Sequence, residues 1–522
     1  MSTAAFSLPS RAVAFFSGPV GLATKIALLS MVNAIAVWAV VVLLDHHKWP
    51  ALIAVVAVTV ALDLLYLAPR AVPAKFLIPG TFFLICFQVI PVLYTVDVAF
   101  TNWSTGHLLV KSEAIQGIKR NTLAESGKAY TMAPARDSHG NLVLLLIDQD
   151  TNKQYLGTKD GLKPLPPRTF KVSIGTITAA KGYDVLRGDQ LAGIDKELSA
   201  FTVPVGGDNA VRAEGLTQAV ELHPTLRYDR ARDRFVRISD GKVFTDNGRG
   251  SYASGKEELE PGWRTYVGFT NFSRLIHNKL VRDPFIRVFI WTIVFATLTV
   301  FLSFAIGLFL AITLNKDGMR GRWAYRSVLV LPYAIPGFLS LLVWGGLLND
   351  DFGVVNRLLG HIGINVPWLF DANWARVSVI LVSVWLTFPY FFLISLGALQ
   401  SIPGELVEAA RVDGAGRFQV FRNVTLPLLL VAVAPLMIAS FAFNFNNFGN
   451  IYFLTGGGPA SNDQSIAGAT DILISYTYKL AFASGKGQDY GLASTIAIFI
   501  FVIIATISAV SFSRTKALEN LN

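Results

Sequence analysis

Residues Phe285–Leu314 read FIRVFIWTIVFATLTVFLSFAIGLFLAITL, an apolar run whose one charged residue is Arg287. An α-helix needs about 20 apolar residues to cross the hydrocarbon core of a bilayer, and this run exceeds that length. It therefore predicts a transmembrane helix and places the chain in a membrane.

Further apolar runs of similar length lie on both sides of this one. The other expected spans are Ile26–Leu44, Ala51–Ala68, Phe76–Phe100, Val328–Leu348, Val377–Leu399, Leu426–Leu454 and Leu492–Phe512. Only 15% of the 522 residues are charged, whereas soluble domains carry roughly 25%. We expect an all-α polytopic membrane protein with eight transmembrane helices. The single cysteine, Cys86, excludes a disulfide within the chain.

Residues 101–283 interrupt this pattern between the third and fourth expected helices and resemble a soluble domain in composition. Apolar or alternating segments occur at Asn141–Asp148, Thr169–Thr176 and Arg234–Ile238, with turn residues such as Asp240-Gly241 between segments. Short strands at such spacing predict a β-rich inserted domain. The sequence shows no cluster of metal ligands and no Gly-x-Ser-x-Gly motif, so docking or a scaffold role is favoured over catalysis.

Basic residues fall on one side of the membrane in this topology, and that side is expected to be cytoplasmic. They are Arg11, Lys25, Arg70, Lys75, Lys316, Arg320, Arg322, Arg326, Arg411, Arg417, Arg422, Arg514 and Lys516. Both termini are then cytoplasmic, and the inserted domain lies outside the cytoplasm. The expected parts are 1–100, an N-terminal cytoplasmic segment and helices one to three; 101–283, the periplasmic inserted domain; 284–513, a core of helices four to eight with a cytoplasmic loop at 401–425; and 514–522, a cytoplasmic tail.

The seventh expected helix contains SFAFNFNNF at 440–448, which places three asparagines in an apolar run. At helical spacing Ser440, Phe443, Asn444 and Asn447 share one face. This face must avoid lipid, because unsatisfied polar groups are costly in hydrocarbon. The amides could hold helices together, or they could face a hydrated cavity, where an aromatic ring beside amides suits a sugar. The residues alone fit both interpretations.

Prolines interrupt two other expected spans. Pro389 lies between Leu386 and Tyr390, which share a helical face, and LPYAIPG at 331–337 breaks its span twice. Broken helices at membrane depth are tolerated mainly where they are buried in protein or line a water-filled path. The pattern therefore favours a transport pathway over a simple membrane anchor.

The loop at 401–427 reads SIPGELVEAARVDGAGRFQVFRNVTLP. Pro403 suits the start of a helix, and Glu405 and Glu408 complement its positive end. A bend near Gly414 precedes a second short helix at Phe418 to Val424. Helices this short are marginal in water unless they dock onto something. Contact with a partner protein and packing against the chain's own bundle both remain open.

This loop resembles the EAA motif of ABC-importer permeases. The match consists of Glu408-Ala409-Ala410, three further residues, Gly414, and an ending at Leu426-Pro427. The resemblance implies that the loop forms coupling helices that contact a separate ATPase subunit. The residues at that contact would be Glu408, Ala409, Ala410, Asp413 and Gly414.

Nearly the whole chain resembles the large permease subunit of bacterial maltose/maltodextrin importers, most closely from residue 380 onward. Eight spans with an insertion after helix three carry this resemblance, together with AFTNWSTGHLL at 99–109 and APLMIASFAFNFNNF at 434–448. TGGGP at 455–459 and GQDYGLA at 487–493 fit it as well. It implies a sugar site halfway across the membrane, which maps to Leu386, Thr387, Tyr390, Ser440, Phe443, Asn444 and Asn447. By this resemblance, Phe443 would stack on the sugar ring, and the amides, Ser440 and Tyr390 would bond its hydroxyls. The family pattern has glycine at the position of Thr387, which leaves the exact sugar open.

The resemblance also implies alternating access driven by ATP, with a smaller permease subunit, an ATPase dimer that uses ATP and Mg, and a periplasmic or lipid-anchored sugar-binding protein. The chain contains no Gly-x-x-x-x-Gly-Lys-Ser/Thr loop, so we expect no enzyme activity and no cofactor in this subunit. One alternative is a permease for another glucoside such as trehalose. Another is an ion-coupled symporter, whose weak candidate carboxylate, Asp63, is expected to snorkel to the interface.

Overall fold

The computed structural model describes residues 19–67, 72–173, 175–206, 209–315, 319–461, 465–483 and 487–519. Arg11, Arg70 and Lys316, which supported the expected orientation, lie outside these residues. So do the first 18 residues and the last three residues of the tail. The chain divides into two compact units, Met1–Tyr94 and Thr95–Asn522, which are described separately.

The first unit contains a helical hairpin. Its helices are α2 (Pro19–Asp45) and α3 (Trp49–Leu67), followed by α4 (Val72–Leu84), the π-helical turn η1 (Ile85–Val89) and the start of α5 (Ile90–Ala99). Asn33 in α2 donates a hydrogen bond from Nδ2 to Oδ1 of Asp63 in α3 at 3.0 Å. Asp63 thus has a hydrogen-bond partner within the hairpin.

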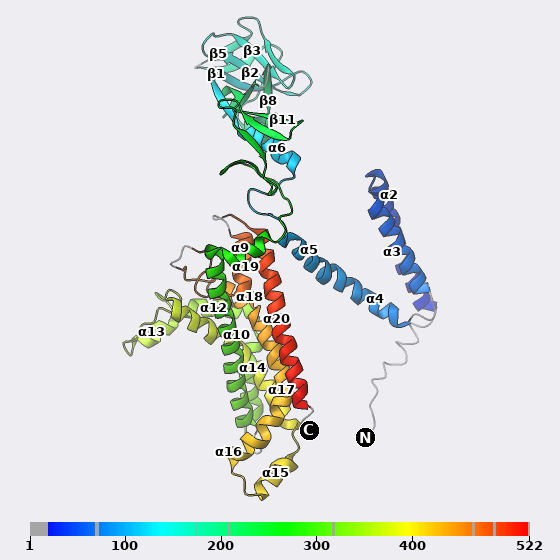
Figure 1. Ribbon diagram of the computed structural model, residues 1–522, viewed down its shortest axis with the longest axis vertical. Coiled ribbons are helices and arrows are strands. Elements are labelled where there is room, and N and C mark those ends of the chain that lie inside the picture. The colour runs from blue at the N-terminus through cyan, green and yellow to red at the C-terminus, as the bar shows by residue number, and fades with distance from the viewer. Residues whose placement is uncertain are drawn as a thin grey trace. The chain divides into compact units, whose positions relative to one another are not determined.

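Four long helices form the core of the second unit and lie side by side in Figure 1. They are α10 (Lys279–Leu314), α14 (Ala372–Ser401), α17 (Leu426–Phe445) and α20 (Tyr490–Glu519). The shorter α9 (Thr270–His277) and α19 (Leu473–Phe482) pack against α10 and α20. Gly307 allows α10 to approach α14 closely, because a Cβ there would lie 2.6 Å from the backbone nitrogen of Phe392.

The expected eight spans are confirmed, and the fifth is sharply bent. Among the described residues, seven helices are long and apolar enough to cross a membrane, and α11 (Arg322–Ala334) with α12 (Gly337–Leu347) form a further pair bent by 92°. The break falls at Ile335 and Pro336, because proline lacks the amide hydrogen that would continue the helix. The short α13 (Val354–Gly360) follows.

The seventh span differs from the single helix expected at Leu426–Leu454. α17 ends at Phe445, and α18 (Phe448–Leu454) begins after a two-residue break. Asn447 caps α18, accepting a hydrogen bond on Oδ1 from the amide of Asn450 at 3.3 Å. Asparagine side chains compete for backbone hydrogen bonds and so favour caps over helix interiors. Asn447 therefore does not continue the helical face of Ser440.

Two π-helical turns stand directly ahead of prolines. The turn η1 ends two residues before Pro91, and η2 (Phe421–Thr425) ends two residues before Pro427. A proline ring clashes with the carbonyl group one turn earlier, and a wider turn gives that carbonyl room. Through η2 the loop helices α15 (Gly404–Val412) and α16 (Arg417–Val420) run on into α17.

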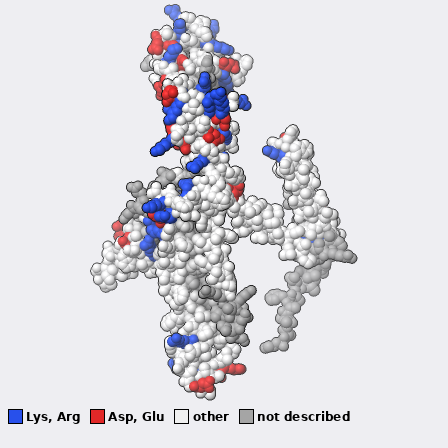
Figure 2. Space-filling view, viewed as in Figure 1, with Lys and Arg blue, Asp and Glu red and all other residues white. Residues whose placement is uncertain are grey.

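The inserted domain is β-rich, as expected. An eight-stranded antiparallel sheet has the order β4-β3-β2-β1-β10-β9-β8, with β7 paired to β1; a second sheet runs from β11 to β15, and β5 pairs with β6. The elements are α6 (Lys111–Asn121), β1 (Leu123–Arg136), β2 (Leu142–Asp148), β3 (Gln154–Thr158), β4 (Gly161–Pro164), β5 (Phe170–Ser173), β6 (Thr176–Ala180), β7 (Asp184–Val185), α7 (Asp189–Ala192), α8 (Asp195–Ala200), β8 (Thr202–Gly206), β9 (Asn209–Glu214), β10 (Gln218–Pro224), β11 (Leu226–Asp229), β12 (Arg234–Arg237), β13 (Val243–Asp246), β14 (Tyr252–Ser254) and β15 (Glu257–Leu259). Figure 2 shows charged side chains gathered over this domain, whereas the sides of the helical bundle carry few.

An ionic network joins α6 to the second sheet. Lys111 donates to Oδ2 of Asp233 at 2.6 Å and to Oδ2 of Asp246 at 2.7 Å, while Tyr228 donates to Oδ1 of Asp233 at 2.7 Å and Tyr252 donates to the same oxygen. Burial alone would raise the pKa of Asp233, but the hydrogen bonds from Lys111 and the two tyrosines outweigh it and lower the pKa to about 2.

We expect Asp233→Asn to make the stability of the inserted domain less dependent on pH in the acidic range. A carboxyl group with a depressed folded-state pKa contributes stability above its unfolded pKa of about 4 and loses it as the pH falls toward about 2. The native domain should therefore become easier to cleave with pepsin across that interval, while the variant, already weakened at neutral pH, changes less. Digestion of the full-length protein measures this, with Asp160→Asn in an exposed turn as the control. Equal pH dependence in both variants would contradict the prediction.

Candidate functional site

One cavity of about 620 Å³ lies where the two broken spans meet the proline-containing α14. Its lining comes from α11, α12, α14, α17, α18 and the two helix breaks: Pro332, Tyr333, Ile335, Gly337, Phe338, Leu341, Leu386, Thr387, Tyr390, Ala439, Ser440, Phe443, Asn447, Gly449, Asn450 and Phe453. Its volume falls in the range of about 300–1,000 Å³ typical of small-molecule sites. The helix irregularities noted in the sequence thus converge on one cavity.

Most residues that the resemblance assigned to the sugar site line this cavity. Leu386, Thr387 and Tyr390 reach it from α14, and Ser440 and Phe443 reach it from α17. Asn447 reaches the same cavity from the break rather than from a continuous helix face.

Asn444 is the exception, because its side chain is completely buried and does not line the cavity. Its amide nitrogen donates to the carbonyl oxygen of Ser440 at 2.8 Å and contacts Oγ of Ser440 at 3.4 Å. Its Oδ1 has no hydrogen-bond partner among the described residues. Asn444 therefore supports Ser440 from behind the cavity wall.

The cavity combines aromatic faces with hydroxyl and amide groups. The exposed fraction is 69% for Phe443, 58% for Tyr333 and 50% for Phe338. Aromatic rings offer broad apolar faces, whereas Ser440 and Asn447 offer donors and acceptors. This combination can hold a ring with apolar C–H faces and hydroxyl groups at its edge.

Sequence reasoning missed several lining residues. Asn450 is buried, lines the cavity and donates from Nδ2 to Oγ of Ser383 at 2.9 Å, which joins α18 to α14. The rings of Phe338 and Phe453 lie close together, with centroids 6.4 Å apart and planes tilted by 50°. The prolines at 331–337 predicted a break in this span. They did not predict which side chains would line the cavity, because the bend of 92° cannot be derived from local sequence.

A second cavity of about 650 Å³ is a weaker candidate. Its lining residues come from the N-terminal half of α10 and the start of α14 and include Ile286, Ile290 and Arg376. Arg376 is already engaged, since its Nε donates to the carbonyl of Ala469 at 3.0 Å and its guanidinium lies 5.2 Å from the ring of Trp291. None of its lining residues belongs to a helix break.

The EAA loop forms two short helices, α15 and α16, in which most residues are exposed. α15 contains no buried residue, and Glu408, Ala409 and Asp413 are all exposed. Gly414 has φ of +85°, a left-handed conformation that ends α15 at low steric cost. Val412 is 87% exposed and Phe418 is 71% exposed. Packing against the chain's own bundle, one of the two open interpretations, is thus not what stabilises α15.

Comparison with known proteins identifies the family. Residues 303–519 match the family described as binding-protein-dependent transport system inner membrane component, and residues 82–160 match the N-terminal of TM subunit in PBP-dependent ABC transporters. The maltose/maltodextrin transport system permease protein MalF of Escherichia coli O157:H7 is 36% identical over 458 residues, covering 86% of this chain and 88% of that protein. The MalF protein of Klebsiella aerogenes is 35% identical over 466 residues, covering 86% of this chain and 88% of that protein.

Among solved structures, a bacterial ABC transporter involved in the import of the acidic polysaccharide alginate matches with a TM-score of 0.42 and 25% identity. The match covers 48% of this chain and 84% of that chain. The assignment rests on the sequence relatives, whose similarity spans both the inserted domain and the helical core. The chain therefore belongs to the MalF family of binding-protein-dependent ABC-importer permeases, and it is a multi-pass transport subunit of the inner membrane rather than an enzyme.

Proposed function

We propose that this permease carries maltose or maltodextrin-type sugars, and that the cavity between the broken spans is its sugar site. The observation that carries the proposal is the convergence of Leu386, Thr387, Tyr390, Ser440, Phe443 and Asn447 on one cavity. The relatives named for maltose and maltodextrin transport support the choice of sugar.

Each side chain has a role that follows from its chemistry. Phe443 supplies the apolar face on which the sugar ring stacks, and Leu386 narrows the same wall. Ser440, Asn447 and Tyr390 form hydrogen bonds with sugar hydroxyls. Asn444 acts indirectly, holding Ser440 through the bond of 2.8 Å to its carbonyl oxygen.

The proposed energy source is a separate ATPase dimer that uses ATP and Mg. Glu408, Ala409, Ala410, Asp413 and Gly414 form the surface that contacts it, and the exposure of α15 supports this role. A 9-residue helix without buried side chains gains its stability from docking. ATP-driven closure of the dimer then moves α15, and η2 carries the movement into α17.

The proposed complex also contains a smaller permease subunit and a periplasmic or lipid-anchored sugar-binding protein. Both termini and the loop at 401–425 lie in the cytoplasm, and the inserted domain lies outside it, where the binding protein docks. The short loops on the side assigned to the cytoplasm carry more basic residues than those on the opposite side, which supports this orientation. No cofactor is assigned to this chain.

Co-purification with the neighbouring subunits tests the proposal. The reconstituted complex should hydrolyse ATP faster when its binding protein is loaded with maltose or a maltodextrin than when it is empty. Stimulation by trehalose or another glucoside instead would reassign the sugar. Uptake by this chain alone, driven by a proton gradient, would overturn the ABC mechanism in favour of a symporter.

Thr387 offers a test of the sugar specificity. We expect Thr387→Val, which keeps the shape and removes the hydroxyl, to lower sugar affinity by about 2- to 10-fold, the range of one net hydrogen bond. Thr387→Ser keeps the hydroxyl and should retain most of the affinity. Binding of radiolabelled sugar to the purified complex measures both variants. Equal affinity in the valine variant would show that this hydroxyl does not touch the sugar.

A further inference from the structure

Two stretches of sequence that do not line the cavity contact each other directly. Thr105, near the start of the inserted domain, donates its amide to the carbonyl of Gln488 at 2.7 Å, and the amide of Gln488 donates to Oγ1 of Thr105 at 2.7 Å. The amide of Gly491, in the first turn of α20, donates to the carbonyl of Trp103 at 3.0 Å. We call residues 101–107 together with 487–491 the neck clamp. Thr105 and Gln488 are 383 residues apart in the chain.

The clamp holds both ends of the inserted domain, not one strand alone. Asn102 pairs with the segment that leaves the domain, exchanging hydrogen bonds with Thr265 at 3.1 and 2.8 Å. Its Nδ2 also donates to the carbonyls of Arg249 at 2.7 Å and Trp263 at 3.0 Å. A force on the inserted domain therefore reaches the clamp through both of its chain connections.

Asp489 ties the clamp to two helices. Its Oδ1 accepts from the amide of Leu492 at 2.9 Å and so caps α20, while its Oδ2 accepts from Arg274 of α9 at 3.0 Å. The ring of Tyr490 packs against that of Trp103, with centroids 5.0 Å apart and planes tilted by 40°. The packing leaves no room at Gly491, where a Cβ would lie 2.4 Å from the carbonyl oxygen of Thr101. The contact is thus tight as well as hydrogen-bonded.

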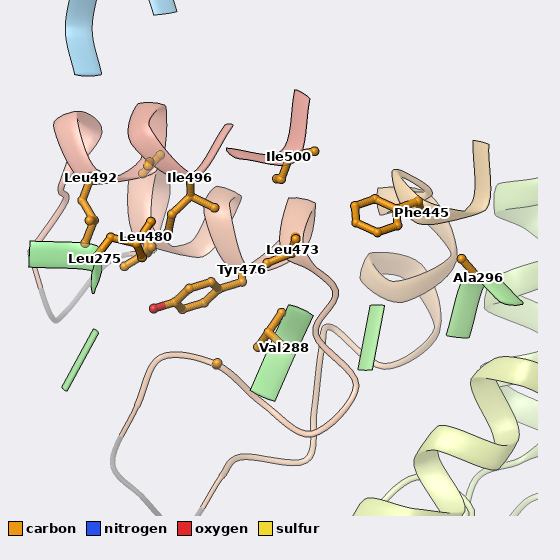
Figure 3. Close-up of a cluster of buried hydrophobic side chains, with 13 residues drawn as sticks. Leu275, Val288, Ala296, Phe445, Leu473, Tyr476, Leu480, Leu492, Ile496 and Ile500 are labelled. Carbon is orange, nitrogen blue, oxygen red and sulfur yellow. The ribbon is translucent and has the colours of Figure 1, made fainter. Parts of the chain in front are cut away.

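From the clamp, continuous packing leads to the cavity wall. Figure 3 shows Leu492 and Ile496 of α20 beside Leu480 and Tyr476 of α19, in a buried cluster that also contains Phe445. Phe445 is fully buried and is the last residue of α17. It directly precedes the break at 446–447 that presents Asn447 to the cavity.

We infer that the neck clamp is a mechanical link through which a protein docked on the inserted domain acts on the α17–α18 break by way of α20. The inference rests on the proposed function, because it requires a binding protein that docks outside the membrane. Trp103 and Asp489 are positioning residues in this link and do not touch the sugar. The hydrogen bonds of the neck clamp stay formed while the docked protein acts on the α17–α18 break.

An oxidation experiment tests whether the clamp works closed. Cysteines are placed by Thr105→Cys and Gln488→Cys in a Cys86→Ser background, which removes the only native thiol. The reduced and oxidised forms of the same assembled complex are compared for ATP hydrolysis stimulated by the sugar-loaded binding protein. We expect equal stimulation in both forms. Loss of stimulation on oxidation would show that the neck must separate from α20, and would overturn the inference.

A second experiment loosens the clamp. Trp103→Ala removes the contact with Tyr490, and Asp489→Asn removes the charge that pairs with Arg274 while keeping an oxygen that can cap α20. Asp371→Asn is the matched control, because Asp371 caps α14 through the amides of Asn373 and Trp374. We expect maximal stimulation to fall by about 2- to 30-fold in the first two variants, the range of a lost coupling contact.

The binding-protein concentration for half-maximal stimulation and the unstimulated hydrolysis rate should stay unchanged in these variants. If the variants instead need a different binding-protein concentration but reach full maximal stimulation, the inserted domain only docks the binding protein, and the inference is overturned. Unaltered kinetics in both variants would also overturn it. If the native complex shows no stimulation by any sugar-loaded binding protein, the proposed function fails, and that result is distinct from failure of the clamp.

Discussion

Phe443→Ala is expected to lower sugar affinity by about 30-fold, equivalent to about 2 kcal/mol for an aromatic contact at the centre of a binding site. The ring is 69% exposed within the chain and faces the cavity with Tyr333 and Phe338. Its removal should leave folding intact, because an exposed ring contributes little to the core. Sugar binding to the purified complex and uptake into proteoliposomes both measure the effect.

A matched control separates stacking from loss of apolar surface. Phe309 in α10 has a similar exposed fraction, 68%, and does not line the cavity. Phe309→Ala should therefore preserve sugar affinity, and Phe443→Tyr should preserve most of it by keeping a ring. If both alanine variants lose affinity equally, the cavity is not the sugar site.

Glu408→Lys is expected to reduce sugar-stimulated ATP hydrolysis by about 30-fold or more, because reversing a charge inside a docked surface costs at least as much as truncating it, about 2–5 kcal/mol. The residue is exposed on α15, so the change should not disturb the chain's own packing. Pull-down of the ATPase subunit and hydrolysis assays on the reconstituted complex measure assembly and coupling separately.

Glu405→Lys serves as the comparison, since Glu405 lies on the same short helix and is also exposed. Glu405 lies in the first turn of α15, so Glu405→Lys opposes the positive end of the helix dipole, and a loss in this variant reports on helix stability. The additional loss in Glu408→Lys reports on contact with the ATPase. Identical behaviour of the two variants would remove Glu408 from that contact.

The spans could be predicted from the sequence because a bilayer imposes a length and an apolar composition that are visible in one dimension. The β-rich insertion was equally visible, since strands such as β2 and β12 match segments expected from alternation and turn residues. The pairing of β1 with β10 was not predictable, because it joins residues as distant as Leu123 and Pro224 through contacts that no local pattern encodes.

The candidate site, too, could be predicted only in part from the sequence. Helical spacing placed Ser440 and Phe443 on one face, and both line the cavity. The break after Phe445 was missed because an apolar run was extended through Asn446 and Asn447, where capping outweighs helix continuation. Tyr333 and Phe338 were missed because their places in the cavity wall depend on the bend between α11 and α12 and on how these helices pack against α14 and α18.

The close contact at Gly307 has a consequence for how the subunit can move. The side of Gly307 where a Cβ would stand faces the backbone of Phe391 and Phe392, so the main chains of α10 and α14 lie almost in contact there. Sliding or rolling there would force backbone atoms into one another, whereas interdigitated side chains can swap rotamers. We expect α10 and α14 to move together as one rigid pair during transport. The pathway would then open and close by movements at the two helix breaks, one between α11 and α12 and the other between α17 and α18.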